Sequence, residues 1–349
     1  MRNADAVNVT QLAGFDEVID VRSPGEFAED RVPGARNFPV LDDAERARVG
    51  TLYKQVSAFE ARKVGAALTA RNIAAHIERD LLDRPQGWRP LVYCWRGGKR
   101  SASMAHVLRE VGWPAATLEG GYRAYRRAVL DDLAHLPSRF RWRVLCGRTG
   151  SGKSRLLRTL AAFGAQVLDL EALACHRGSV LGHLPDAPQP SQKWFESLVR
   201  QALAGLDPAQ AVYVESESRR IGGISVPEAL IESIRGGECF QVEATLAHRV
   251  ALLKKEYAHL VANPEVLAGK LARLTSLHGR ERIAAWQGLA REGRMDELVA
   301  MLLELHYDPS YGRSIRKNFS RHDAARLVPL AGIADGDFAN LARRLAGAD

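Results

Sequence analysis

The sequence predicts an α/β protein made of two successive parallel-sheet domains and a mainly helical C-terminal region. Three observations carry this prediction. Short apolar segments alternate with helical segments in residues 1–137, the alternation resumes in residues 138–247, and residues 248–349 keep helical spacing broken by glycine or Asn-Pro. Such alternation is typical of parallel sheets, because a helix must carry the chain back to the start of the next strand. We therefore expect three regions with these boundaries.

The elements of the first region follow from apolar runs and helical spacing. Strands are expected at 17–21, 90–94 and 115–121, and helices at 72–82 and 101–111. A linker is expected at 133–142, where a proline and polar residues interrupt the pattern.

The second region shows the same alternation around a glycine-rich loop. Strands are expected at 143–147, 165–171, 211–217 and 239–244, and helices from about residue 154 and at 193–206. This domain is expected to end near residue 244, after which the chain becomes mainly helical.

Composition indicates an ordinary globular chain of two or three domains. It has 349 residues, of which 46% are hydrophobic and 26% charged. The N-terminus lacks the pattern of a signal peptide and no apolar run reaches membrane length, so we expect a cytoplasmic protein without a membrane partner. The net charge of +8 suits a polyanion such as RNA, although a solvated surface explains it equally well.

The four cysteines are scattered. Cys94, Cys146, Cys175 and Cys239 form no C-x-x-C pair, so the sequence predicts reduced thiols and no zinc site or disulfide framework.

The most specific local pattern is "GRTGSGKS" at 147–154. It fits G-x-x-x-x-G-K-[ST] directly after a strand and before a helix, which is the context of a phosphate-binding P-loop. The glycines let backbone amides converge on phosphate oxygens, Lys153 neutralises phosphate charge, and Ser154 can bind Mg²⁺. The predicted phosphate-binding residues of the loop are Gly147, Arg148, Thr149, Gly150, Ser151, Gly152, Lys153 and Ser154.

Acidic residues follow two of the strands predicted beside this loop. Glu215 and Glu217 could join Ser154 in orienting Mg²⁺ or its water, or could form ion pairs with Arg219 or Arg220. Asp169 and Glu171 belong to the same sheet edge, where ligands of open α/β sheets bind. For this second pair, helix N-capping is an equally open interpretation.

The segment "LVYCWRGGKRS" places a thiol between a strand and a helix. Loop amides, the helix terminus and three cations, Arg96, Lys99 and Arg100, would favour an anion around Cys94. Such a field lowers the pKa of a thiol and makes its sulfur nucleophilic. Taken alone, this stretch fits a reactive thiol or a core residue equally well, and the C-x5-R spacing is also found in phosphatases.

Segments before and after the Cys94 loop favour the interpretation of Cys94 as a reactive thiol. "VIDVRSPGEFAEDRVPGARNFPV" at 18–40, the Cys94 loop and "LEGGYRAYR" at 118–126 occur in the order of a rhodanese domain, which residues 1–137 resemble. The resemblance implies that Cys94 carries or handles transferable sulfur or selenium. Asp20 and Arg22 match the rhodanese "DVR" element, and we expect them to brace the loop through a salt bridge.

The resemblance extends into the P-loop region. "DLEALACHRGS", "PSQKWFE" and "ESESRRIG" follow the two loops in the order of the tRNA 2-selenouridine synthase family, so that residues 15–240 resemble that family strongly. Related sequences tend to have Asp between the two glutamates, whereas this chain has Ser216, which puts a metal role of the middle position in doubt. The resemblance implies a rhodanese-like domain, a P-loop NTPase-like domain and a helical remainder.

The resemblance to this family also implies an activity. The resemblance implies a transferase that converts 2-thiouridine at the tRNA wobble position to 2-selenouridine, through S-geranyl-2-thiouridine, using geranyl diphosphate and then selenophosphate. We expect no tightly bound cofactor, while Mg²⁺ could bind, and we expect a selenophosphate-producing enzyme as a partner. The residues that would act are Cys94, Arg96, Lys99, Arg100 and Lys153, with Arg177 added to the phosphate-binding set.

Several points stay open at this stage. Cys94 could form a perselenide or only position selenophosphate. A P-loop kinase or ATPase fused to a rhodanese sulfurtransferase acting on a small molecule is the rival function, and a non-catalytic anion sensor is a second. The segment 306–322 mixes aromatic and basic residues and is predicted to contact tRNA.

Overall fold

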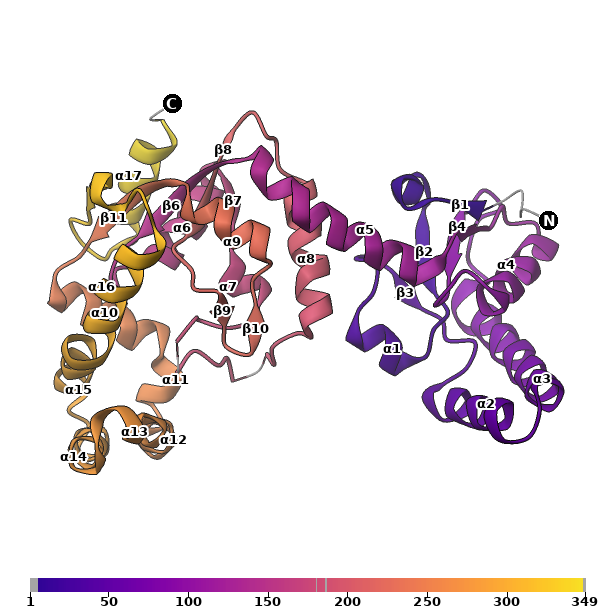
Figure 1. Cartoon of the computed structure of the whole chain (residues 1–349), viewed down its shortest axis with the longest axis horizontal. Coiled ribbons are helices and arrows are strands. Elements are labelled where there is room, and N and C mark those ends of the chain that lie inside the picture. Colours follow the sequence, from indigo (N-terminus) through magenta and orange to yellow (C-terminus); the bar gives the residue numbers. More distant parts are fainter. Residues whose placement is uncertain (1–5, 180, 186, 348–349) are drawn as a thin grey trace. The chain divides into compact units, whose positions relative to one another are not determined.

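The computed structural model describes residues 6–179, 181–185 and 187–347, and the chain divides into two compact units (Figure 1). The first unit contains the chain up to Ala134 together with Pro190–Gln201, and the second contains His135–Gln189 and the chain from Ala202 onward. The expected α/β class with parallel sheets is confirmed in both units.

A five-stranded parallel sheet organises the first unit. Its order is β1-β5-β4-β2-β3, with bounds Ala6–Val7, Ala116–Leu118, Pro90–Tyr93, Glu17–Asp20 and Arg36–Asn37. Every residue of the central strand β4 is buried, as expected for a strand covered on both faces. The helices of this unit are α1 (Pro24–Glu29), α2 (Asp43–Gln55), α3 (Ala58–His76), α4 (Lys99–Val111) and α5 (Gly121–His135).

Local sequence signals explain where these helices begin and end. Asp42 accepts a hydrogen bond from the amide of Glu45, whose side chain accepts one from the Asp42 amide, and this capping box starts α2. Ser57 caps α3 in the same position, and Gly112 ends α4 in the left-handed conformation that glycine adopts readily. A π-helical turn, Ile77–Leu81, extends α3.

A second five-stranded parallel sheet organises the second unit. Its order is β12-β11-β6-β8-β7, with bounds Arg326–Pro329, Glu238–Glu243, Arg141–Cys146, Ala211–Glu215 and Gln166–Leu168. Along the chain, the helices between these strands are α6 (Lys153–Ala162), α7 (Leu170–Leu173), α8 (Gln192–Ala204) and α9 (Glu228–Arg235), of which α8 belongs to the first unit up to Gln201. A small hairpin pairs β9 (Arg220–Ile221) with β10 (Ile224–Ser225). Leu145 of β6 pairs with Glu215 of β8, so the two loops that follow these strands start at the same edge of the sheet.

The C-terminal third is mainly helical, as expected, but it also completes this sheet. Its helices are α10 (Leu246–Glu256), α11 (Ala258–Val261), α12 (Pro264–Leu271), α13 (Thr275–His278), α14 (Arg280–Arg291), α15 (Met295–Leu302), α16 (Asp308–Asn318) and α17 (Asp335–Ala346). Strand β12 lies parallel to β11, and Phe338 of α17 joins the apolar core with Leu156 of α6. The sheet therefore does not end near residue 244, because a strand contributed about 80 residues later in the chain extends it.

The segment 133–142 is not an irregular linker. It forms the last turn of α5, a 3₁₀ turn at Leu136–Arg139 and the start of β6. Pro137, Phe140 and Trp142 are buried, and the Trp142 indole donates a hydrogen bond to the Pro137 carbonyl at 3.0 Å. These apolar contacts order a stretch whose proline suggested a break.

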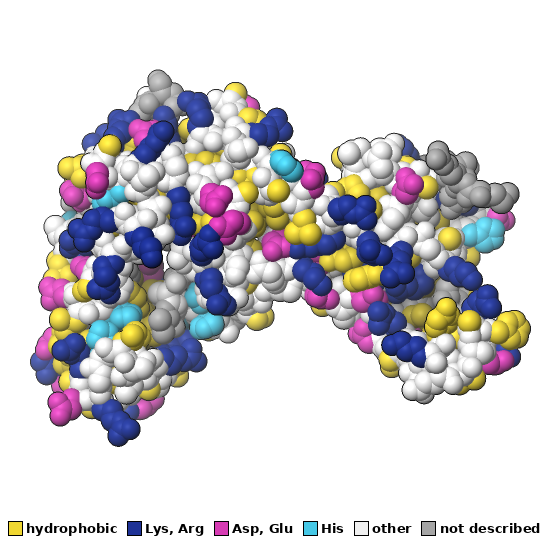
Figure 2. All heavy atoms as spheres, in the orientation of Figure 1, with side chains coloured by type: hydrophobic (Ala, Val, Ile, Leu, Met, Phe, Trp, Pro, Cys, Tyr) yellow, Lys and Arg dark blue, Asp and Glu magenta, His cyan; other side chains and the backbone are white. Residues whose placement is uncertain are grey.

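Within the described ranges, none of the helices combines the length and apolar character needed to cross a bilayer. On the face shown in Figure 2, Lys and Arg side chains are spread over the surface of each unit.

Candidate functional site

Cys94 follows β4 directly, and the loop after it closes over the sulfur. The Cys94 Sγ accepts hydrogen bonds from the Gly98 amide at 3.2 Å and from the Ser101 hydroxyl at 3.3 Å. Gly97 makes this turn with φ +64°, where a Cβ atom would lie 2.7 Å from the Leu118 carbonyl oxygen. Only glycine fits that combination of conformation and contact.

The loop stabilises the ionised form of the thiol. Burial of Cys94 opposes ionisation, but hydrogen bonds from Ser101 and from the amides of Gly98 and Arg96 outweigh it and lower the pKa of the thiol. Cys94 is only 3% exposed and also contacts the apolar core of its unit. The sulfur is therefore a buried group whose ionised form the loop stabilises.

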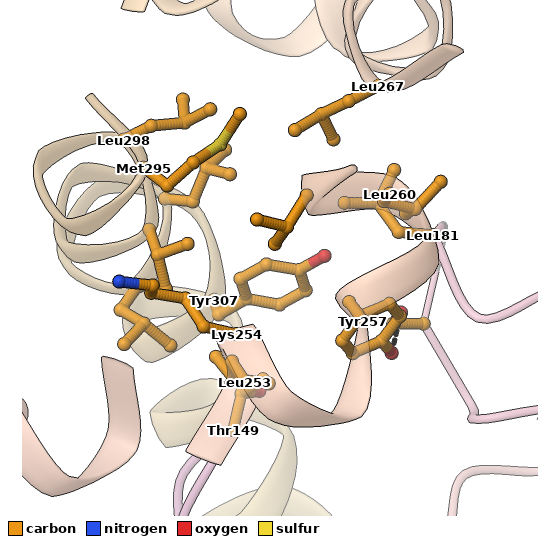
Figure 3. A pocket seen from close by; sticks show the side chains of 15 residues that line it. Thr149, Leu181, Leu253, Lys254, Tyr257, Leu260, Leu267, Met295, Leu298 and Tyr307 are labelled. Carbon is orange, nitrogen blue, oxygen red and sulfur yellow. Dashed lines mark hydrogen bonds between the residues drawn. The ribbon is translucent and has the colours of Figure 1, made fainter. Parts of the chain in front are cut away.

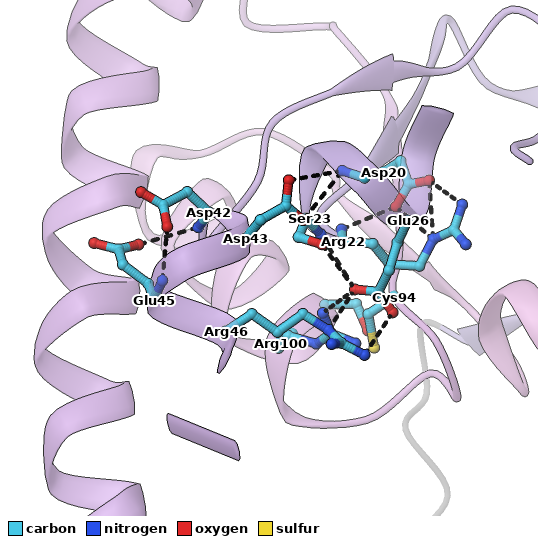
Figure 4. A network of polar contacts seen from close by, with 12 residues as sticks. Asp20, Arg22, Ser23, Glu26, Asp42, Asp43, Glu45, Arg46, Cys94 and Arg100 are labelled. Atoms are coloured by element: carbon cyan, nitrogen blue, oxygen red, sulfur yellow. Dashed lines mark hydrogen bonds and ion pairs between the residues drawn. The ribbon is translucent and has the colours of Figure 1, made fainter. Parts of the chain in front are cut away.

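The three cations predicted around the sulfur differ in their surroundings. Arg100 forms an ion pair with Glu26 at 3.1 Å, and Glu26 also binds Arg46 at 2.9 Å; Figure 4 shows this network beside Cys94. Burial opposes ionisation of Glu26, but the two arginines prevail and lower the pKa of its carboxyl. Arg96 and Lys99 are exposed.

The salt bridge expected between Asp20 and Arg22 is confirmed. The pair is buried at 2.6 Å, and the Arg22 guanidinium also donates to the Asp30 carbonyl and lies 4.0 Å from the ring centre of Tyr122 (Figure 4 shows the pair). Tyr122 comes from the "EGGY" segment, and its amide donates to the Cys94 carbonyl at 2.8 Å. This ion pair thus braces the segment that packs under the loop.

The P-loop connects β6 to α6 as predicted. The Lys153 ammonium folds back over the loop and donates to the Gly147 carbonyl at 2.8 Å, while the Gly147 amide donates to the Tyr311 hydroxyl at 2.6 Å. Gly150 has φ +78°, and a Cβ atom there would lie 2.9 Å from Leu253 of α10. The loop is therefore packed directly against helices of the C-terminal third.

A cavity of about 430 Å³ opens in front of this loop. Of the predicted phosphate- and metal-binding residues, the cavity is lined by Thr149, Gly150, Lys153, Ser154, Arg177, Glu215 and Glu217. Gly147, Arg148, Ser151 and Gly152 belong to the loop but are not among its lining residues. A ligand-sized space thus lies in front of the loop, with cations and carboxylates among its lining residues.

Three carboxylates gather at one side of this cavity. Burial raises the pKa of Glu171 to about 10 and that of Glu217 to about 8, and repulsion from the neighbouring Glu215 adds to both shifts. Burial also raises the pKa of Glu215, whose Oε1 is buried without a hydrogen-bond partner. Crowded, desolvated carboxylates are stabilised by a cation between them.

Ser154 and the carboxylates beside it supply some, but not all, of the ligands that a Mg²⁺ ion needs. Among the described residues, no group of three or more His, Cys, Asp or Glu is arranged to hold a metal ion alone. Mg²⁺ in such sites is held mainly by phosphate oxygens, waters and one or two protein oxygens, a requirement that Ser154 and a neighbouring carboxylate meet. The alternative ion pair with Arg219 is not formed, because Arg219 binds Glu228.

The two interpretations of the 169–171 pair divide between its members. Asp169 caps α7 by accepting a hydrogen bond from the Ala172 amide at 2.8 Å. Glu171 lines the cavity and lies 3.5 Å from the Ser154 hydroxyl. From the sequence, the only signal was an acidic residue after a strand, which fits a helix cap and a ligand-binding residue equally well.

The second part of the "CHRGS" segment lies at the cavity, which is lined by Arg177, Gly178 and Ser179. Arg177 lines the cavity, donates to the Glu256 carbonyl at the end of α10, and lies 5.0 Å from the ring centre of Tyr257. His176 instead packs against His183 and does not line the cavity.

Three tyrosines that sequence reasoning did not assign to this site line the cavity: Tyr257, Tyr307 and Tyr311. The last two belong to the segment 306–322, which had been predicted to contact tRNA. Its aromatic content was a signal of function, but the sequence could not show that the segment packs on a loop more than 150 residues earlier.

Comparisons with known proteins agree with this arrangement. Residues 140–277 match the family described as "tRNA 2-selenouridine synthase AAA domain", and residues 5–128 match "Rhodanese-like domain". The chain is 34% identical to the tRNA 2-selenouridine synthase of Hydrogenovibrio crunogenus, over 88% of this chain and 91% of that protein. It is 36% identical to the tRNA 2-selenouridine synthase of Nitrosomonas europaea, over 74% and 68% of the two chains.

Proposed function

Because the chain belongs to the tRNA 2-selenouridine synthase family, we propose that it acts on tRNA and replaces the sulfur of a wobble 2-thiouridine with selenium. The observation that supports this proposal is the presence of two loops with the groups that favour anions in one chain. One holds an activated thiol under loop amides, and the other holds a lysine, a serine and carboxylates around a cavity. Each site suits one phosphorylated donor.

We assign the P-loop cavity to the first step, alkylation by geranyl diphosphate. The allylic C–O bond breaks and its electron pair leaves with diphosphate, while the tRNA sulfur bonds to the allylic carbon and the base loses its N3 proton to solvent. Lys153 and the loop amides would stabilise the departing diphosphate. Ser154 and a neighbouring carboxylate would hold Mg²⁺, which would supply further charge neutralisation when bound.

We assign the Cys94 loop to the second step. Selenium of selenophosphate bonds to C2 of the base, the C2–S bond breaks and geranylthiol leaves; water then cleaves the Se–P bond to give phosphate. The loop amides and Arg100 would bind the selenophosphate anion. This route balances with water alone, whereas a perselenide on Cys94 needs a two-electron oxidant to form with release of phosphate and an additional thiol to release the product.

Reconstitution with purified components tests both assignments. With tRNA containing 2-thiouridine, Mg²⁺, geranyl diphosphate and selenophosphate, the wild type should yield 2-selenouridine by nucleoside mass spectrometry. Lys153→Ala should block formation of S-geranyl-2-thiouridine but still convert tRNA that already carries it. Cys94→Ser should accumulate the S-geranyl intermediate, while Cys175→Ser, at a thiol outside both sites, should behave like the wild type.

Two results would overturn the proposal. Cys94→Ser converting geranylated tRNA at the normal rate would remove the thiol from the second step. Nucleotide hydrolysis stimulated by tRNA, without any alkylation dependent on the allylic diphosphate, would favour the P-loop ATPase instead. Intact-protein mass after treatment with selenophosphate separates a perselenide from simple anion binding.

A further inference from the structure

A second, apolar cavity adjoins the P-loop cavity. Its volume is about 60 Å³, and five residues line both spaces: Thr149, Ser179, Leu253, Tyr257 and Tyr307. The apolar cavity therefore begins where the P-loop cavity ends, and a ligand held by the loop could extend into it.

Side chains of α10, α11, α12 and α15 enclose this space (Figure 3). Beyond the shared residues, its walls consist of Leu181, Lys254, Leu260, Val261, Leu267, Met295, Leu298, Val299, Leu302 and Leu303. Only the stem of Lys254 contributes, since its ammonium binds Asp296 at 2.6 Å and points away from the cavity in Figure 3. Leu298 is fully buried and Met295 nearly so.

Two of the hydroxyl groups that line this cavity already contact each other at its mouth. The Ser179 hydroxyl lies 3.3 Å from the Tyr257 hydroxyl, within hydrogen-bonding distance. A nucleobase or ribose in the cavity would lose its hydrogen bonds to water and gain few from leucine, valine and methionine, a substantial cost. A hydrocarbon would restore the contacts that the walls of an apolar void lack.

We propose that this cavity receives the hydrocarbon tail of the allylic diphosphate and sets the length of tail that the protein accepts. The inference rests on the proposed function, in which the P-loop holds the diphosphate. A buried water needs roughly 10–15 Å³ by the same measure, so the cavity takes a row of about four to six such groups. That room suits about one isoprene unit of five carbons, so the other unit of a geranyl tail would lie in the space shared with the P-loop cavity, and a much longer chain is excluded.

Chain-length selectivity tests the proposal. Wild type, Leu298→Phe and Leu298→Ala would be compared for alkylation of 2-thiouridine tRNA by dimethylallyl, geranyl and farnesyl diphosphate. Filling the cavity should shift the ratio of kcat/KM towards dimethylallyl by at least about tenfold, the discrimination typical of a pocket that gains or loses a methylene. Emptying it should raise the use of farnesyl diphosphate. Leu289→Phe, in the same apolar cluster but outside the cavity walls, is the matched control and should keep the wild-type profile.

A binding measurement keeps the test informative if a variant loses turnover. The affinity of Leu298→Phe for a non-reactive thiolo analogue of geranyl diphosphate should fall, while its affinity for inorganic pyrophosphate should match that of the wild type, which also shows that the loop is folded. Wild-type alkylation with identical chain-length profiles in all variants would overturn this inference and leave the proposed function standing. Failure of the wild type to use any allylic diphosphate would overturn both.

Discussion

The Arg249 guanidinium donates two hydrogen bonds to the Asp308 carboxylate, at 2.5 and 3.0 Å. Its Nε donates a third hydrogen bond to the Thr149 carbonyl in the P-loop, at 2.8 Å. Arg249 belongs to α10 and is 3% exposed, and Asp308 begins α16. One guanidinium therefore ties two helices of the C-terminal third to the backbone of the phosphate loop.

Removing this guanidinium should damage both stability and ligand binding. Arg249→Ala leaves the Asp308 carboxylate without its main partner in a largely buried site, so we expect a loss of about 3–5 kcal/mol in the free energy of unfolding. Urea denaturation and pyrophosphate titration measure the two effects. Arg291→Ala, which breaks an exposed ion pair with Glu265, is the control and should leave both almost unchanged.

The packing of α10 on the P-loop predicts different outcomes at two glycines. Gly150 and Gly164 have φ +78° and +84°, but a Cβ atom at Gly150 meets Leu253 at 2.9 Å, whereas nothing lies within 4 Å at Gly164. Gly164→Ala should therefore cost only the backbone penalty of roughly 1–2 kcal/mol. Gly150→Ala should cost more and weaken pyrophosphate binding. Equal losses by thermal unfolding would show that the α10 contact does not matter.

Ser101 should control the reactivity of the Cys94 thiol. Its hydroxyl is the chief hydrogen-bond donor that lowers the pKa of Cys94, so Ser101→Ala should raise this pKa and slow alkylation of the thiol at neutral pH. The pH profile of iodoacetamide labelling measures the shift. Ser103→Ala, on the same helix but bonded only to the Lys99 carbonyl, should leave the profile in place.

The buried glutamates predict how stability depends on pH in the absence of Mg²⁺. The folded protein keeps protons on Glu171 and Glu217, with pKa values of about 10 and about 8, which the unfolded chain releases near its ordinary 4.5. The free energy of unfolding should therefore fall as pH rises from 4.5 towards 8, by at most about 1.4 kcal/mol per pH unit for each group.

Glu171→Gln removes one of the two titrating carboxyls, so the free energy of unfolding should depend less steeply on pH. Denaturation series at several pH values measure the slope. The exposed Glu281 offers the control, since Glu281→Gln should keep the wild-type slope. A Glu171→Gln protein as sensitive to pH as the wild type would show that this carboxyl is ionised in the fold.

Both loops were predictable from sequence because their requirements are local. A P-loop needs its glycines, Lys153 and a flanking strand and helix within about twenty residues, and the Cys94 loop likewise carries its own amides and Ser101. The contacts of Tyr311 with Gly147 and of Arg249 with Asp308 join residues far apart in the chain. The sequences of α10 and α16 contain no motif that predicts these contacts. Strand β12 was missed for the same reason, since a four-residue stretch that begins with an arginine and buries one side chain looks alike in a loop and at a sheet edge.

The edge position of β12 also constrains biosynthesis. Residues 326–329 can pair with β11 only after about 80 further residues have been synthesised, so β11 keeps an unpaired edge during that interval. Premature termination before Arg326 would leave the edge of β11 free to pair with strands of other chains. Truncated products should therefore aggregate instead of persisting as partly active fragments.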